Sequence, residues 1–191
     1  LIITEGIIDA ILAIEAGYSV LSPATTQFSN DQIAQMVRLS TSASMIYIIN
    51  DEEESGAGTR GAIKTAEALN QANNTAHIVT LPRSPHQSKV DLADFLSSGA
   101  NDLAPILQTA PDFLQFQINQ LANLSGAEKQ QGLKKVARQL TRLESFDQQS
   151  YVDQVVEAKL MNRQPFKSMI KAVDAEERQK RAEERFEQAQ L

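Results

Sequence analysis

Cysteine is absent from this sequence of 191 residues, tryptophan is absent too, and histidine occurs only twice. Without cysteine, the segment cannot be a disulfide-bonded scaffold, hold a zinc ribbon or use a thiol nucleophile. No apolar run approaches the roughly 20 residues that a membrane-spanning helix needs, and no signal-peptide pattern is present. We therefore expect a cytoplasmic protein without a membrane partner. The sequence begins with Leu in a strand-like run, so we also expect a piece of a longer protein.

Basic residues are in the minority, since 18 Lys and Arg stand against 24 Asp and Glu and the net charge is −6. Residues 1–110 have 12 acids and 5 bases, a net charge of −7, whereas residues 111–191 have 12 acids and 13 bases, a net charge of +1. Neither part has the broad basic face expected of a self-sufficient nucleic-acid-binding protein. If nucleic acid is the partner, metal ions or other parts of the protein must help to hold it.

The first 110 residues alternate between strand-like and helix-like segments. Short apolar runs predict four strands, at Leu1–Thr4, Tyr18–Leu21, Met45–Ile49 and Ala76–Leu81. Three helices are predicted in this part. The first spans Ile7–Ala16 and ends at Gly17, the second begins after a cap at Ser29 or Asn30, and the third spans Thr59–Ala72. This alternation predicts an α/β fold with a mainly parallel four-stranded sheet that helices cover on both faces.

From about Pro111 the pattern is helical only. A capping box is expected at Ser125-Gly126-Ala127-Glu128, followed by an apolar stripe from Leu133 to Leu143. Asp147 is expected to cap the next helix, and Pro165 suits the first turn of the last one. Residues 174–191 are mostly charged, with expected pairs Glu176–Lys180 and Glu177–Arg181 on a solvated helix. We therefore predict an α/β domain over 1–110, a helical subdomain over 111–173 and a charged helical tail over 174–191.

Acidic residues follow three of the predicted strands. They are Glu5 and Asp9, Asp51 to Glu54, and Asp91 and Asp94. Because the carboxyl ends of parallel strands form the ligand crevice of an open sheet, these carboxylates should meet there. They would repel one another unless a cation lay between them, and their oxygen ligands favour Mg²⁺ or Mn²⁺. The pattern indicates phosphoryl or nucleotidyl transfer.

Each of these features also has a simpler explanation. A single acid after a strand is often a helix cap or a solvated loop residue. Gly56 and Gly58 could hold a phosphate at a helix N-terminus or could form a plain turn. Arg60, Arg83 and Lys89 are candidate phosphate contacts, but ordinary surface charge explains them equally well.

The combination of motifs is more specific than any one of them. Glu5-Gly6-Ile7-Ile8-Asp9, Asp51-Glu52-Glu53 and Val90-Asp91-Leu92-Ala93-Asp94-Phe95-Leu96 resemble the motifs of the Toprim domain, which bacterial DnaG-type primases, topoisomerases and some nucleases share. Glu53 stands where that family has the second Asp of D-x-D. Ala93 stands where the primase D-P-D motif has its second Asp, so one metal ligand is missing or Asp94 replaces it.

The resemblance implies a Toprim (Rossmann-like) fold with Mg²⁺ or Mn²⁺ at the acidic cluster. It implies Glu5 as general acid/base or ligand, with Asp9 and Asp51 as the other catalytic candidates. The implied metal ligands are Glu5, Asp51, Glu53 and Asp91, with Asp94 as the candidate replacement for the acid missing at Ala93. Arg60, Arg83 and Lys89 stay candidate phosphate contacts because they flank the predicted site.

In function, the resemblance implies a primase of the plasmid or phage kind that makes RNA primers from NTPs on a single-stranded DNA template. A replicative helicase is a further candidate partner. Two alternatives stay open: a Toprim metal-dependent nuclease, and a non-catalytic module whose residues 111–191 dock a helicase. We expect the fragment to be inactive in primer synthesis by itself, because it has no zinc module and no evident basic surface for a template.

Overall fold

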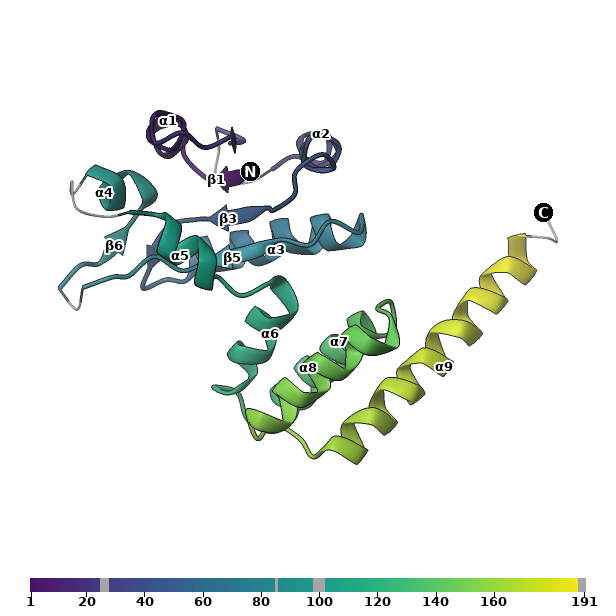
Figure 1. Cartoon of the computed structure of the whole chain (residues 1–191). Helices are drawn as coiled ribbons and strands as arrows, with labels where there is room; N and C mark the ends of the chain where they lie inside the picture. The colour runs from purple at the N-terminus through teal and green to yellow at the C-terminus, as the bar shows by residue number, and fades with distance from the viewer. Residues whose placement is uncertain (25–27, 85, 98–101, 189–191) are drawn as a thin grey trace. The chain divides into compact units, whose positions relative to one another are not determined.

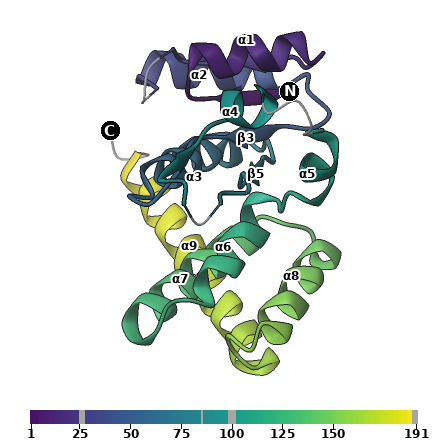
Figure 2. The same cartoon turned by 90° about the vertical axis from the view of Figure 1, so that its left-hand side faces the viewer.

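The computed structural model describes residues 1–24, 28–84, 86–97 and 102–188. The chain divides into two compact units, Leu1–Phe113 and Leu114–Leu191, which are described separately (Figures 1 and 2). Among the described residues, no helix is both long and apolar enough to cross a membrane.

The first unit is built on a parallel four-stranded sheet. Its strands are β1 (Ile2–Thr4), β2 (Val20–Leu21), β3 (Tyr47–Ile49) and β5 (His77–Val79), in the order β2-β1-β3-β5. All three pairings in this sheet are parallel, so the predicted α/β fold with a mainly parallel sheet is confirmed. The four strands lie within the four predicted runs.

Both faces of this sheet are buried, as the apolar strands predict. On one face, Ile2, Ile49 and Val79 pack in a cluster with residues of α1 (Ile7–Glu15), α4 (Leu92–Ser97) and α5 (Ala104–Thr109). On the other face, Ile48 and Ile78 are at most 3% exposed. There, α3 (Ala57–Gln71) contacts β3 and β5, and α2 (Asn30–Ser40) packs beside α3. Parallel sheets need such cover on both sides.

A second, two-stranded sheet was not predicted. Its strands, β4 (Glu52–Glu53) and β6 (Lys89–Val90), pair antiparallel, with Glu53 opposite Lys89. Each strand is only two residues long, and three of the four residues are charged, so the strands lack the apolar alternation that marks a strand in a sequence. This small sheet brings the segment before Asp91 next to the segment after Asp51.

The helix ends confirm some sequence predictions and correct others. Ser29 caps α2, and Ser29 and Gln32 form a reciprocal capping box. Ser125 precedes α7 (Gly126–Leu140), but its side chain makes no cap hydrogen bond, so the capping box predicted there is wrong. Gly126 has φ +55°, a left-handed conformation that separates Ser125 from the regular turns of the helix. The expected cap at Asp147 is also wrong, because α8 (Ser145–Glu157) begins two residues earlier and Asp147 lies in its first turn.

The second unit consists of α7, α8 and α9 (Arg163–Gln188), together with most of α6 (Phe113–Leu121). The predicted stripe on α7 is confirmed as core, with Leu133 and Leu140 fully buried and packed in one cluster with Phe166 of α9. Pro165 lies in the first turn of α9, as predicted.

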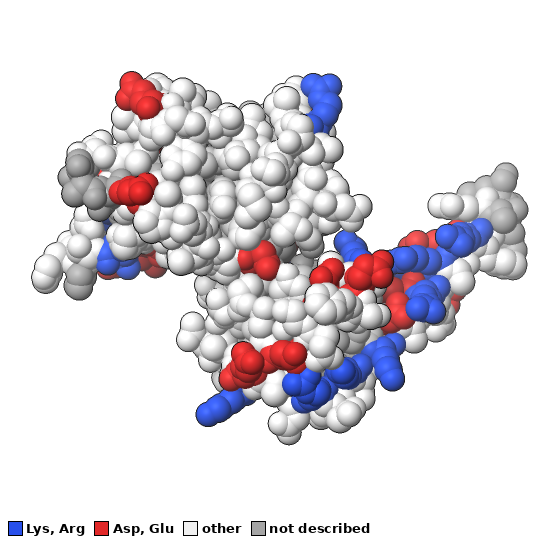
Figure 3. All heavy atoms as spheres, viewed as in Figure 1, with Lys and Arg blue, Asp and Glu red and all other residues white. Residues whose placement is uncertain are grey.

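Helix α9 runs without a break through residues 174–188, the described part of the charged segment. Glu176 and Glu177 pair across to Lys134 and Arg138 of α7, at 3.2 and 2.9 Å. The expected intrahelical pairs with Lys180 and Arg181 are therefore replaced by interhelical ones, because α7 packs alongside this part of α9. On the face that Figure 3 shows, basic side chains gather over the helical unit but alternate there with acidic ones.

Candidate metal centre

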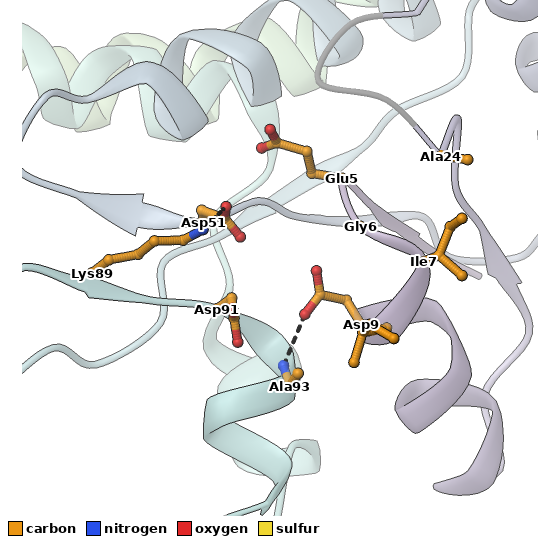
Figure 4. A pocket seen from close by; sticks show the side chains of 10 residues that line it. Glu5, Gly6, Ile7, Asp9, Ala24, Asp51, Lys89, Asp91 and Ala93 are labelled. Atoms are coloured by element: carbon orange, nitrogen blue, oxygen red, sulfur yellow. Dashed lines mark hydrogen bonds and ion pairs between the residues drawn. The ribbon is translucent and has the colours of Figure 1, made fainter.

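Four acidic residues of the first unit, Glu5, Asp9, Asp51 and Asp91, line an open pocket of about 430 Å³ at the carboxyl end of the parallel sheet. Glu5 directly follows β1, Asp51 comes two residues after β3, and Asp91 directly follows β6. Glu5 and Asp51 thus lie beyond the carboxyl ends of parallel strands, as predicted. Asp91, which was expected after the fourth strand of that sheet, follows β6 of the second sheet instead and reaches the pocket from there. The pocket residues are Glu5, Gly6, Ile7, Ile8, Asp9, Ala24, Asp51, Lys89, Asp91 and Ala93 (Figure 4).

Asp9 joins the two helices that border the pocket. It lies in the first turn of α1 and is only 7% exposed. Its Oδ1 accepts a hydrogen bond from the backbone N–H of Ala93 at 2.9 Å, and its carboxylate also accepts one from the backbone N–H of Gly6. A Cβ on residue 6 would lie 2.6 Å from Asp9 Oδ2, so glycine at this position leaves room for the Asp9 carboxylate. The Glu-Gly-x-x-Asp spacing thus places a buried carboxylate against the start of α4.

Asp51 forms an ion pair inside the pocket. Its Oδ2 lies 2.6 Å from the ammonium nitrogen of Lys89, which reaches it from β6 (Figure 4). Gly58 of α3 packs against the Asp51 backbone, where a Cβ would come within 1.9 Å of the Asp51 carbonyl oxygen. Gly56 is the N-cap of α3 with φ +66°. Both glycines of this loop therefore have a structural role in the turn and in the packing of α3.

Asp91 and Asp94 take different positions. Asp91 Oδ1 accepts a hydrogen bond from the Asp94 backbone N–H at 2.7 Å, so Asp91 caps α4 and still lines the pocket. The Asp94 side chain is exposed, and Asp94 is not among the described residues that line the pocket. Glu53, on β4, is also outside that lining. Of the expected metal ligands, the structure places Glu5, Asp51 and Asp91 around the pocket, together with Asp9.

Of the three predicted phosphate contacts, one lies in the pocket and two lie outside its described lining. Lys89 lies in the pocket, whereas Arg60 and Arg83 are outside its described lining. Arg60 donates to the Ser55 carbonyl oxygen at 2.8 Å. Arg83 donates to two carbonyl oxygens of the loop before β6 and lies 3.8 Å from a Glu54 carboxylate oxygen. Both arginines thus brace loops beside the site.

The electrostatics of the pocket reflect crowded negative charge. Burial raises the pKa of the Glu5 carboxyl above its ordinary 4.5, and the nearby Asp51 raises it further, although Lys89 lowers it. Burial also raises the pKa of Asp9 above 3.8, against the hydrogen bond from Ala93. The hydrogen bond to Asp51 raises the pKa of Lys89 above 10.5. An added cation would relieve the repulsion between these carboxylates.

The donor atoms of the pocket fit a magnesium or manganese ion in kind, since both prefer carboxylate oxygens and water. Among the described residues, no three acidic or histidine side chains stand close enough to hold an ion as one group. In Figure 4 the four carboxylates lie around the pocket and do not converge on one point. Binding an ion would therefore require side-chain rotation, with water or substrate oxygens supplying further ligands.

The contact between Lys89 and Asp51 is a feature of the site that the sequence does not predict. The sequence indicates Lys89 only as a candidate phosphate contact, because the β4–β6 pairing that places it is not visible in the pattern. The one available signal was its position two residues before Asp91.

The family comparison matches residues 1–102 to the Toprim domain. This chain belongs to the Toprim domain family. The expected Toprim fold is thereby confirmed, and Glu5, Asp9, Asp51 and Asp91 all lie in the matched range.

Among solved structures, the chain resembles the Aquifex aeolicus primase structure that contains the zinc-binding and RNA polymerase domains. The TM-score is 0.61 at 17% sequence identity, and the likeness covers 86% of this chain and 38% of the primase chain. At this identity the likeness establishes the shared fold, and the chain spans less than half of that primase. No curated protein sequence matches this Toprim chain.

Proposed function

We propose that this Toprim protein takes part in priming DNA replication, as a metal-dependent nucleotidyltransferase of the primase type. The observation that supports the proposal most directly is the placement of Glu5, Asp9, Asp51 and Asp91 around one pocket at the carboxyl end of the sheet. The fold likeness to a solved primase extends into the helical unit, since it covers 86% of the chain. The substrates in this proposal are NTPs, an RNA primer end and a single-stranded DNA template.

The residues of the pocket have separate roles in this proposal. Asp51 and Asp91 would hold the Mg²⁺ or Mn²⁺ ion. When bound, the ion supplies positive charge that stabilises the attacking and leaving oxygens of phosphoryl transfer. Glu5 has a raised pKa, which suits a group that accepts the proton of the attacking hydroxyl. Asp9 fixes the start of α4 through the Ala93 N–H and so positions Asp91.

Binding of Mn²⁺ to the chain is the first test, because it does not need the rest of the priming machinery. Calorimetric titration should show binding that Asp51→Asn and Asp91→Asn weaken. Asp94→Asn is the matched control, since this exposed acid is close in sequence but lies outside the described pocket lining. Equal Mn²⁺ affinity in the wild type, D51N and D91N would overturn the metal site.

The reaction itself is tested with the intact gene product, because the chain spans 38% of the solved primase. With Mn²⁺, NTPs and a single-stranded template, we expect short RNA products from the wild type and none from D51N. Degradation of the template in place of synthesis would support the Toprim nuclease alternative. Neither reaction, with metal binding intact, would favour the non-catalytic docking module.

A further inference from the structure

Lys89 occupies an unusual place for a basic residue in an acidic pocket. Its ammonium nitrogen lies 2.6 Å from Asp51 Oδ2, and it faces Glu53 across the β4–β6 pair. The Lys89 side chain is 48% exposed, whereas that of Asp51 is 17% exposed. The Lys89 ammonium therefore lies against the more enclosed member of the pair.

The start of α4 contributes no carboxylate to the pocket at position 93. Ala93 lines the pocket at the position where the primase motif that this sequence resembles has its second Asp. Ala93 contributes only its backbone N–H, which it donates to Asp9. Asp94, the nearest acid that could replace the missing ligand, has an exposed side chain outside the described lining. Compared with that motif, the pocket therefore has one carboxylate fewer, and it contains the Lys89 ammonium.

We propose that the Lys89 ammonium acts as a tethered second cation of this pocket, taking the place of a second metal ion. The inference rests on the proposed metal site and goes beyond it, because it assigns the site one divalent ion and a lysine. An ammonium carries one positive charge and needs no ligand set, so it balances Asp51 without the carboxylate missing at Ala93. It also competes with the divalent ion for the Asp51 carboxylate.

The competition predicts a definite change in metal binding. Lys89→Met keeps most of the apolar stem and removes the charge. A divalent ion then no longer displaces an ammonium from Asp51, and its affinity should rise on the order of tenfold. Lys64→Met is the matched control, because Lys64 is an exposed lysine on α3 outside the described pocket lining and its removal changes the net charge equally.

The number of bound ions tests the inference further. We expect one Mn²⁺ per chain in the wild type and two in the double variant Lys89→Met/Ala93→Asp, which restores the missing acid and removes the ammonium. Two Mn²⁺ ions about 3.5–4 Å apart, the spacing of two-metal sites, should give an exchange-coupled electron paramagnetic resonance signal. Circular dichroism melts of each variant show whether it is folded.

Three outcomes separate the inference from the proposed function. If the wild type binds one Mn²⁺ that D51N loses, but K89M binds it as the wild type does, the tethered-cation role is wrong and the metal site stands. Two bound Mn²⁺ ions per chain in the wild type would also overturn the tethered-cation role. If neither the wild type nor K89M binds Mn²⁺, the metal site and the inference both fail.

Discussion

A Cβ on Gly58 would lie 1.9 Å from the carbonyl oxygen of Asp51, so helix α3 packs directly against the backbone that presents this acid. Gly58→Ala should therefore force α3 and the Asp51 loop apart. We expect a loss of about 1–3 kcal/mol or more in the free energy of unfolding, as for other overpacked sites. Mn²⁺ affinity should fall as well, because Asp51 moves. Urea unfolding and calorimetric titration measure the two effects.

Gly61→Ala is the control for this variant. It lies on the same helix, but the nearest atom to its Cβ would be the side-chain nitrogen of Asn50, at 2.9 Å. That side chain can shift, and alanine favours the helix by up to about 1 kcal/mol over glycine. G61A should therefore lose much less stability than G58A. Equal losses in G58A and G61A would show that the Asp51 contact has no special role.

The stability of the metal-free protein should depend on the protonation of Asp9 and Glu5. Because burial raises both pKa values, the folded protein binds more protons than the unfolded chain above the ordinary values of 3.8 and 4.5. The free energy of unfolding therefore falls as pH rises through this window, and it does not recover at neutral pH. Asp9→Asn and Glu5→Gln should each flatten this dependence in urea unfolding measured in chelator-treated buffer. If the free energy of unfolding of both variants falls with pH as steeply as that of the wild type, Asp9 and Glu5 are not the cause of the pH dependence.

The sequence allowed the main sheet and the place of the pocket to be predicted for a physical reason. A strand buried on both faces, as at Ile48 and Ile49 of β3, must be apolar on both sides, and that pattern is visible without a structure. Acids after such strands must lie at the same edge of a parallel sheet. Glu5 and Asp51 follow β1 and β3 of that sheet, as this rule predicts. Asp91 follows β6 of the second sheet instead, so its place in the pocket rested on the resemblance to the Toprim motifs.

The features that were missed depend on contacts between distant segments. The β4–β6 sheet pairs charged residues, so Lys89 had no local signal that would place it on Asp51. Glu53 and Asp94 have the same residue type as the pocket acids, and only the three-dimensional arrangement puts them outside the described lining. The partners of Glu176 likewise depend on α7 packing beside α9 rather than on spacing within one helix.

The ion pairs between α7 and α9 should contribute little to stability. Lys134 and Glu176 are about half exposed, and the Arg138–Glu177 pair is only somewhat more enclosed. Such pairs are typically worth about 0–1 kcal/mol each. We expect Glu176→Gln/Glu177→Gln to lower the thermal midpoint only slightly at low salt and not at all in 1 M NaCl, where charges are screened. A large loss that persists in high salt would mean that these residues do more than pair charges.

Phe166 should be far more important for the helical unit than these pairs. It is fully buried, it is one of the largest side chains in the core of this unit, and it packs in the cluster that holds Leu133 and Leu140. Phe166→Ala should cost about 3–5 kcal/mol, because it removes buried apolar surface and leaves a cavity. Phe186→Ala on the same helix is the control, since Phe186 is 67% exposed. Hydrogen exchange by mass spectrometry on the whole chain should show faster exchange across α7 and α8 in F166A, with peptides of the parallel sheet unchanged. If exchange in α7 is the same in F166A and F186A, Phe166 does not hold these helices together.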